Sequence, residues 1–511
     1  MKYLTLAVSA LLACAAAHAQ SPIANLIQNG ERAAALEAIH ARGADVNATQ
    51  GDGTTPLHWA VYKVDRELVA ELLDHGAKPD VTNKYGSSPL AEAAKLGDLE
   101  LVRQLLDAGA NVESPNADGQ TALMLAARIG SLDVAKLLVE RGADVNAKEA
   151  WRDQTALIWA VDNNFPELTQ FLIDSGADVG ARASANDWDS QITAEPRAQY
   201  RPVGGLTVLL YAARSGCTRC VRSLLAAGAD IDKPTPEGMT PLMIAIDNQA
   251  YDTARLLLDE GANPNVWDWY GRTALYVAVD MGSFRGRASH PTASSETTAT
   301  DVVRKLLDAG VNPNAQMNMH RPSRGGNIGR FADELLTTGT TPLLRAAIGG
   351  DVETARLLLE HGALVDLPNV QGLTPLMAAA GHTSGRNQRF DTEQAQARAI
   401  ELLDLLLAAG ADINAKLADT NALSARVGRQ PNAVTEREGQ TALFGAVKFG
   451  WANVVEYLLA KGADPNVKDA LGRTPLDGAL GRISGSRESV ASEEVAAMLR
   501  AAGAREPVAA R

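Results

Sequence analysis

A short motif recurs along the chain at a nearly fixed spacing and constrains the fold more than any other feature. A Thr or Ser is usually followed by Pro or Ala and then by Leu, and neighbouring copies are commonly 33 residues apart. A period of about 20 to 50 residues is typical of solenoids and other repeat arrays. The motif occurs eleven times, at Thr55, Ser88, Thr121, Thr155, Thr207, Thr240, Thr273, Thr341, Thr374, Thr441 and Thr474.

Each copy of the motif predicts the start of a helix. The hydroxyl caps the helix, Pro at the first helical position loses no needed hydrogen bond, and Leu faces the core. A second helix is expected to end where Gly adopts the left-handed conformation, as after "VAKLLVER". The chain has twelve such stops and hence twelve expected helix pairs, ending at Gly43, Gly76, Gly109, Gly142, Gly176, Gly228, Gly261, Gly310, Gly362, Gly410, Gly462 and Gly503.

This pattern resembles the ankyrin repeat, whose turn, "GxTPLHxAA" and "VVxLLLxxGADVN" are matched best at 51–81 and 119–147. The resemblance covers 23–504 and implies an all-α ankyrin solenoid of about twelve helix-turn-helix units with hairpin-like turns. The His of the family motif occurs only as His58, so hydrogen bonds through it are expected only there. The first repeat lacks the capped first-helix motif, and the chain ends in a polar tail, 504–511. These two ends are interpreted as the terminal caps of the solenoid.

The solenoid is expected to fill residues 20–511, with a capping unit at 20–49 and repeats at 50–180, 205–314, 339–414 and 439–511. Three insertions of equal length, here called fingers, replace the short turns at 181–204, 315–338 and 415–438. Two further insertions, near 282–300 and 381–397, lengthen the loop between the two helices of a unit, and the loop between Thr474 and Gly503 is lengthened less. Because turns and loops lie at opposite ends of a helix pair, we expect the two classes on opposite edges.

The N-terminus has the features of a cleavable secretory signal over residues 1–19. Lys2 supplies a positive start, an apolar stretch follows, and Ala17-His18-Ala19 is a small-residue cleavage motif. The alternative is lipidation at Cys14. No segment has the length and low charge of a membrane span, and we expect a periplasmic or secreted, monomeric protein.

Charge and motifs exclude several classes of function. The net charge of −13 disfavours binding to nucleic acid, because phosphates would be repelled. The chain has no glycine-rich phosphate loop, no "HExxH" and no "GxSxG". We therefore expect no enzyme, no cofactor and no metal site; the histidines on insertions, His290, His320 and His382, are divided between opposite edges.

A protein partner is expected instead. The resemblance implies that it lies against the turn tips and first helices, where Trp, Tyr and Arg are typical of binding hot spots. Trp59, Trp159 and Tyr211 lie within first helices and are interpreted as packing residues, whereas Trp151 and Trp269 either bind a partner or cover the neighbouring turn. The candidates are Tyr62, Lys63, Lys84, Tyr85, Arg128, Trp151, Arg152, Arg214, Trp269, Tyr270, Met281, Lys448 and Phe449, with Arg321, Arg324 and Arg330 of the second finger.

Apart from Cys14, the only cysteines are Cys217 and Cys220, at the start of a second helix. Three interpretations stay open: inert thiols with Cys217 partly exposed, a disulfide, and a redox-active or metal-binding pair. The second and third would suit an accessory or protective factor for an envelope redox enzyme, as the resemblance to periplasmic ankyrin proteins implies. A small-ligand or catalytic site between fingers and concave face, and a host-directed effector, are the remaining alternatives.

Overall fold

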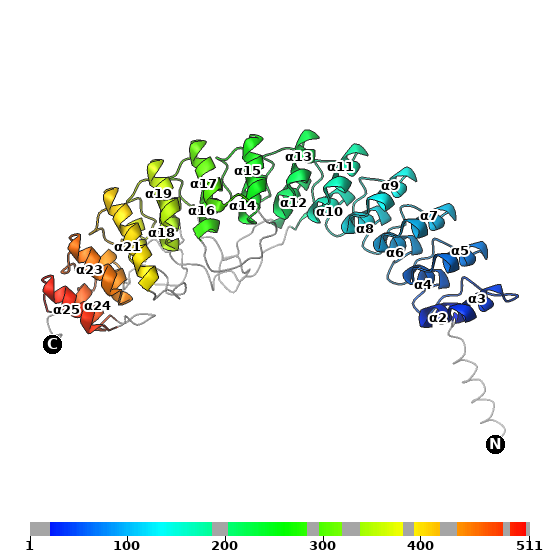
Figure 1. Cartoon of the computed structure of the whole chain (residues 1–511), viewed down its shortest axis with the longest axis horizontal. Helices are drawn as coiled ribbons and strands as arrows, with labels where there is room; N and C mark the ends of the chain where they lie inside the picture. The colour runs from blue at the N-terminus through cyan, green and yellow to red at the C-terminus, as the bar shows by residue number, and fades with distance from the viewer. Residues whose placement is uncertain are drawn as a thin grey trace, which may run out of the picture. The chain divides into compact units, whose positions relative to one another are not determined.

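The computed structural model describes residues 21–186, 203–283, 296–318, 338–381, 393–418, 437–483 and 491–506. The signal-like segment 1–19 and most of each insertion lie outside these ranges. The chain divides into two compact units, the first formed by Met1–Asn186 with Gly204–Lys233 and the second by Asp187–Val203 with Pro234–Arg511. Within each unit the described chain folds into antiparallel helix pairs that follow one another in sequence order (Figure 1).

Two short strands, β1 (Ala185–Asn186) and β2 (Val203–Gly204), pair with each other at the base of the first finger. The first unit contains six helix pairs. Its helices are α2 (Pro22–Asn29), α3 (Arg32–His40), α4 (Pro56–Tyr62), α5 (Arg66–Asp74), α6 (Pro89–Leu96), α7 (Leu99–Asp107), α8 (Ala122–Ile129), α9 (Leu132–Glu140), α10 (Ala156–Asp162), α11 (Pro166–Asp174), α12 (Val208–Ser215) and α13 (Thr218–Ala226).

The second unit contains six further pairs in its described ranges. They are α14 (Pro241–Asp247), α15 (Tyr251–Asp259), α16 (Ala274–Ser283), α17 (Ala299–Asp308), α18 (Pro342–Gly349), α19 (Val352–Glu360), α20 (Pro375–Ala379), α21 (Glu393–Ala408), α22 (Ala442–Lys448), α23 (Ala452–Ala460), α24 (Pro475–Ala479) and α25 (Glu493–Ala501). The all-helical repeat of twelve pairs predicted from the motif is confirmed.

The helices of each unit form two rows. First helices pack on the first helices of adjacent pairs, as α4 packs on α2 and α6, and second helices do the same, as α5 packs on α3 and α7. The Leu two residues after every anchor has an exposed fraction of 1% or less, from Leu57 to Leu476. The core is therefore a continuous strip between the rows, built from one or two apolar residues of each helix turn.

The N-terminal pair departs from expectation. We expected no capped first helix in this unit, and this was wrong: the Ser21 hydroxyl accepts a hydrogen bond from the backbone amide of Ala24 at 3.2 Å, and Pro22 occupies the first helical position. Ser21-Pro22-Ile23 is thus the same helix start with Ile in place of Leu. The first helix of the N-terminal pair, α2, therefore has a capped N-terminus like the first helices of other repeats.

Candidate functional site

The hairpin turns that connect successive pairs are rigid because each is closed by its own backbone. In the turn at 83–87, the Asn83 amide donates to the Ser87 carbonyl at 3.1 Å and the Gly86 amide donates to Asn83 at 2.9 Å. Gly86 has φ of 71°, and a Cβ there would overlap the backbone of Ala117 in the next turn. Glycine at this position therefore permits both the turn and its close approach to its neighbour.

Backbone hydrogen bonds also join adjacent turns. In the first unit the amides of Lys84, Ala150 and Ser184 each donate to the preceding turn at 2.8 Å. In the second unit the Trp269 amide donates to the Glu237 carbonyl at 2.8 Å, and the Asn318 amide donates to Tyr270 at 2.9 Å. The turns of each unit thus form a ladder whose tips are held in fixed register.

The three fingers leave these turns through one shared hydrogen-bond pattern. The amides of Met317 and Leu417 donate to the carbonyls of Thr340 and Gln440, at 3.1 and 2.9 Å, and the Ala183 amide donates to Leu206 at 3.0 Å. Ala183, Met317 and Leu417 are all buried. The described bases of the three fingers therefore continue from hairpin turns; Arg321, Arg324 and Arg330 lie outside the described residues.

Several aromatic side chains project from the turns and first helices. Trp151 is 75% exposed, Tyr85 72%, Tyr62 58% and Trp269 55%. Trp267, which the sequence analysis missed, is 66% exposed and lies in the same turn as Trp269. The run "VWDWYGR" could have revealed it, because side chains alternate in direction along the extended arm of a hairpin.

Tyr270 corrects the expectation of an exposed tip residue. It is 3% exposed and packs in a cluster with Tyr276 and Met317. Met317 belongs to the base of the second finger, so the insertion covers a ring that an ordinary short turn would leave open. Tyr270 therefore supports the finger base and does not offer surface to a partner.

The charged candidates differ in how freely they can engage a partner. The Arg152 guanidinium lies 4.5 Å from the centre of the Trp151 ring, and both side chains are exposed. Arg214 stacks on Tyr211 at 4.6 Å and pairs with Asp162 at 2.6 Å, which holds it between repeats. A cation over an indole face gives the Trp151 tip a mixed aromatic and positive character.

The remaining candidates are placed by their helices. Lys63 and Lys84 are exposed, as is Arg128, whose guanidinium lies 5.5 Å from the Trp159 ring. Met281, Lys448 and Phe449 are half-buried, and the Lys448 ammonium lies 5.8 Å from the Phe449 ring. The lysine tips therefore offer more open surface than the ends of α16 and α22.

The aromatic rings interpreted as packing residues lie within the repeats. Trp159 and Tyr211 are 9% and 5% exposed. Gln154 joins them, since it accepts from the Trp159 indole at 3.1 Å and donates to the Tyr211 hydroxyl at 2.8 Å. Trp59 is half-buried and donates to Gln50 at 2.8 Å. The packing interpretation holds for all three.

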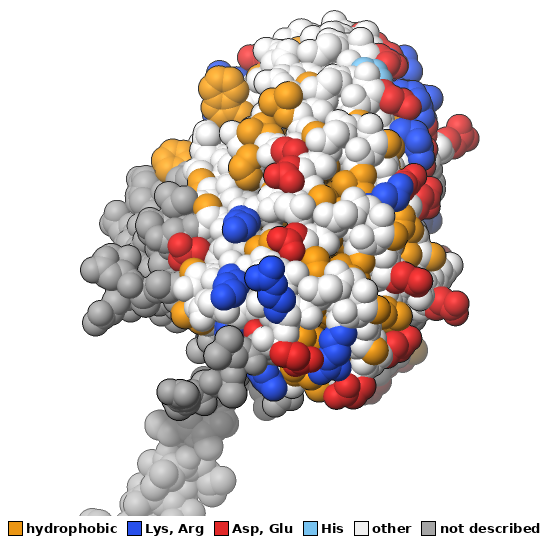
Figure 2. All heavy atoms as spheres, turned by 90° about the vertical axis from the view of Figure 1, so that its left-hand side faces the viewer, with side chains coloured by type: hydrophobic (Ala, Val, Ile, Leu, Met, Phe, Trp, Pro, Cys, Tyr) orange, Lys and Arg blue, Asp and Glu red, His pale blue; other side chains and the backbone are white. Residues whose placement is uncertain are grey.

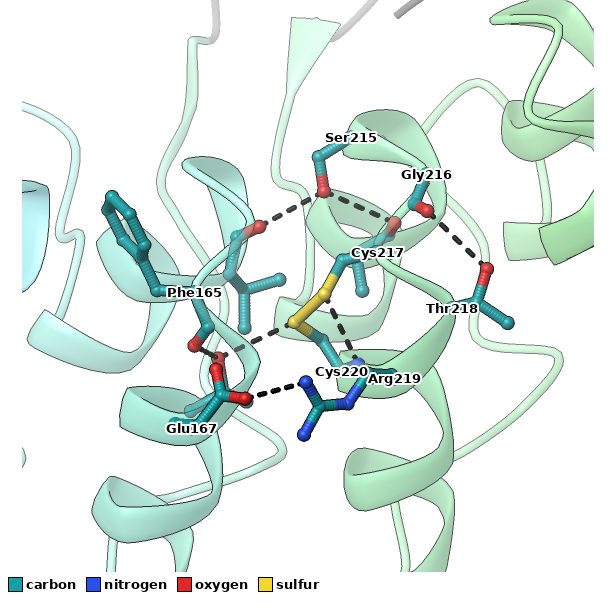
Figure 3. The surroundings of a disulfide bond; sticks show 11 residues. Phe165, Glu167, Ser215, Gly216, Cys217, Thr218, Arg219 and Cys220 are labelled. Carbon is teal, nitrogen blue, oxygen red and sulfur yellow. Dashed lines mark hydrogen bonds and ion pairs between the residues drawn. A yellow bond between two sulfur atoms is a disulfide. The ribbon is translucent and has the colours of Figure 1, made fainter. Parts of the chain in front are cut away.

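Cys217 and Cys220 form a disulfide, as in the second of the three interpretations (Figure 3). Cys217 caps α13, and the expectation that it is partly exposed was wrong, since it is 2% exposed and Cys220 is fully buried. The Thr169 hydroxyl of α11 lies 3.6 Å from the Cys220 sulfur. Helix α11 packs on α13 and covers the bond, so the disulfide is shielded from solvent.

Charged side chains of both signs lie on one face of the structure. Figure 2 shows acidic and basic side chains interspersed on the face toward the viewer, with hydrophobic side chains between them. Exposed pairs such as Lys305–Asp259 at 2.6 Å and Arg141–Asp107 at 2.7 Å join successive second helices. Among the described helices, none combines the length and apolar character needed to cross a bilayer.

His75 and His361 directly follow the second helices α5 and α19. Their Nδ1 atoms lie 2.8 Å from the carbonyls of Glu71 and Leu357, one turn earlier. The expectations for His290, His320 and His382 concern residues outside the described ranges.

Twelve stacked helix pairs with bonded hairpin turns define a helical repeat protein of the kind that presents an extended surface. A family model described as "Ankyrin repeats (3 copies)" matches residues 12–116, 92–183, 192–268, 209–317, 292–417 and 392–492. The chain belongs to the ankyrin-repeat family. Ankyrin repeats generally mediate binding between proteins, and the fold is typically a non-catalytic module.

Individual relatives match parts of the chain. The mouse B-cell lymphoma 3 protein homolog is 37% identical over 95 residues, which are 18% of this chain and 21% of that protein. Phosphocholine transferase AnkX of Legionella pneumophila is 27% identical over 273 residues, 52% of this chain and 23% of that protein. The chain thus spans about a fifth of the length of each.

A solved structure of the Bcl-3 ankyrin repeat domain is similar over 46% of this chain and 98% of that domain, at 27% identity and a TM-score of 0.37.

Proposed function

We propose that this chain is a non-catalytic scaffold that binds a protein partner through its turn tips, first helices and fingers. The observation that carries the proposal is the set of exposed aromatic side chains on hydrogen-bonded turns: Tyr85 and Trp151 in the first unit, Trp267 and Trp269 in the second. Trp and Tyr side chains are typical of the hot spots of protein interfaces. A partner that buries them gains apolar area without having to order the turns first.

The Trp151 tip has the chemistry of a binding hot spot. Trp and Arg are enriched where a few residues carry most of an interface's energy, and Trp151 with Arg152 presents both on one turn. The acidic body disfavours nucleic acid as the partner, since the net charge is −13. A protein surface with an apolar pocket and a nearby carboxylate fits this tip best.

The experiment is affinity capture from cell-envelope extracts with the purified chain as bait. We expect a partner that binds the unaltered chain and is lost, by about tenfold or more in affinity, with Trp151→Ala together with Trp269→Ala. The matched control is Leu364→Ala, which removes an equally exposed apolar side chain, 58% exposed, away from the hairpin tips. Equal binding by all three baits would contradict the proposal.

We also propose that the protein is exported. The signal-like segment 1–19 supports this, and so does the Cys217–Cys220 disulfide, because such bonds persist mainly in oxidising compartments. Fractionation of cells that express the full chain should place the processed protein in the periplasm or medium. Recovery of the unprocessed chain in the cytoplasm would rule export out, and release into the medium or host would favour the effector alternative.

The buried disulfide bears on the alternative of an accessory to a redox enzyme. A sulfur that exchanges electrons with a partner must be reached by it, whereas α11 covers Cys220. We therefore expect Cys217→Ser with Cys220→Ser to preserve partner binding. Loss of binding by a folded double variant would instead favour the redox role.

A further inference from the structure

Three metal-ligating side chains meet on the second helices of the first two repeats. His40 is the last residue of α3, Glu71 lies in α5, and His75 follows α5. One ligand atom from each lies within 4.8 Å of the other two. His40 Nε2 is 3.2 Å from Glu71 Oε2, and the two imidazole ring centres are 5.0 Å apart.

In two other repeats this location holds a carboxylate beside one basic side chain. Asp107 at the end of α7 pairs with Arg141 after α9 at 2.7 Å, and Asp308 at the end of α17 lies 3.3 Å from His361 Nε2 after α19. In the first two repeats His40 replaces this carboxylate. The substitution leaves two imidazoles next to each other beside one carboxylate, a combination that can serve as a ligand set.

The hydrogen bond of His75 prepares the ring for coordination. Its Nδ1 lies 2.8 Å from the Glu71 carbonyl oxygen and donates to it, since a carbonyl can only accept. The proton on Nδ1 leaves the lone pair on Nε2. A metal-binding histidine is commonly oriented in this way, with its second nitrogen donating to a backbone carbonyl.

Two imidazoles and one carboxylate select the kind of ion. Ca²⁺ and Mg²⁺ prefer sets made only of oxygen, whereas Zn²⁺ takes histidine nitrogen together with carboxylate oxygen. The side chains of His40, Glu71 and His75 are 54%, 42% and 37% exposed, so an ion can enter from solvent and the rings can adjust around it. We propose that His40, Glu71 and His75 form a surface Zn²⁺ site that links the first two repeats.

Bound Zn²⁺ would hold the end of α3 against α5. Among the described helices, those of the N-terminal pair pack on the next pair, α2 on α4 and α3 on α5. An ion that binds the folded state adds stability by mass action. The structural consequence is reduced opening of the N-terminal pair when Zn²⁺ is present.

The test is calorimetric titration of the full, tag-free, chelator-treated chain with Zn²⁺. We expect one high-affinity equivalent, weakened at least tenfold by His40→Ala and by His75→Ala, with Ca²⁺ giving no binding at the same concentration. His361→Ala is the matched control, because His361 makes the same carbonyl bond and faces a carboxylate but has no second imidazole. It should bind Zn²⁺ as the unaltered chain does.

Two further measurements make the result decisive. Adding Zn²⁺ should slow hydrogen exchange in α3 of the unaltered chain but not in the Glu71→Gln variant. Circular dichroism verifies that this variant is folded. A triple variant with His290→Ala, His320→Ala and His382→Ala should still bind one equivalent of Zn²⁺. Absence of stoichiometric binding, or loss of it in that triple variant instead of in His40→Ala, would overturn the proposal.

Discussion

His58 shows how much one side chain contributes to the joint between two repeats. Its Nδ1 faces the Thr55 hydroxyl at 2.8 Å within a capping box, and its Nε2 lies 3.0 Å from the Ser87 carbonyl of the next repeat. The ring is 4% exposed. Burial lowers the pKa of His58, while the Ser87 carbonyl opposes the change.

This pKa shift predicts a pH-dependent contribution to stability. In the unfolded chain His58 takes up a proton near its ordinary pKa of about 6.5, whereas the folded ring resists protonation. The unfolded state therefore binds more protons, and stability falls as the pH falls through that range. His58→Ala should cost about 1 to 2 kcal/mol at pH 8, and the difference from the unaltered chain should shrink toward pH 5.

Urea denaturation at a series of pH values measures this difference. His361→Ala is the control, because its ring is more exposed, at 30% of the side chain. The loss in free energy of unfolding caused by His58→Ala should therefore decrease on acidification. If it stayed constant or increased, burial would not control the protonation of the His58 ring.

At the scale of helices, most contacts are apolar, but one buried ion pair joins two first helices. Arg345 of α18 is 2% exposed, and its Nε lies 2.5 Å from Asp280 Oδ1 of α16. In the first unit, Arg214 of α12 and Asp162 of α10 form a similar bond at 2.6 Å with both side chains more than a third exposed. The two pairs differ mainly in burial.

Burial should decide what each pair contributes. Arg345→Ala leaves a largely buried carboxylate without this partner and should cost about 3 kcal/mol, whereas Arg214→Ala should cost less than about 1 kcal/mol. Thermal unfolding followed by circular dichroism compares the two. Equal losses would mean that solvent screens both pairs alike.

On the scale of the whole molecule, stability is expected to be local. Helix α9 packs on α7, α8 and α11, and α23 packs on α21, α22 and α25. Leu138 of α9 and Leu458 of α23 are both fully buried. Since each pair contacts only its neighbours, a defect should spread through adjacent pairs and fade with distance.

Leu138→Ala should therefore cost about 2 to 5 kcal/mol and speed hydrogen exchange in α7 to α11, with α22 to α25 unchanged. Leu458→Ala should instead speed hydrogen exchange in α22 to α25 and leave α7 to α11 unchanged. Hydrogen-exchange mass spectrometry resolves the two sets of peptides. Uniform loss of protection in either variant would show a single cooperative transition.

The repeat pattern by itself determined the number of helix pairs, the buried leucines, and most of the capped helix starts, although the cap at Ser21 was missed. These features are encoded within a single repeat, where a hydroxyl, a proline and a glycine act on backbone a few residues away. The exposed tip of Tyr85 was anticipated for the same reason, since its turn has the ordinary length. The exposed Trp151 was anticipated too, although its turn is one residue longer.

Only the tertiary structure decided the burial of Tyr270 beneath Met317, the covering of the disulfide by α11, and the meeting of His40 with Glu71 and His75. Each depends on residues that belong to the next element in the stack and are separated along the chain by an insertion or a whole repeat. Such contacts follow from how neighbouring repeats are aligned, which a pattern within one repeat does not specify.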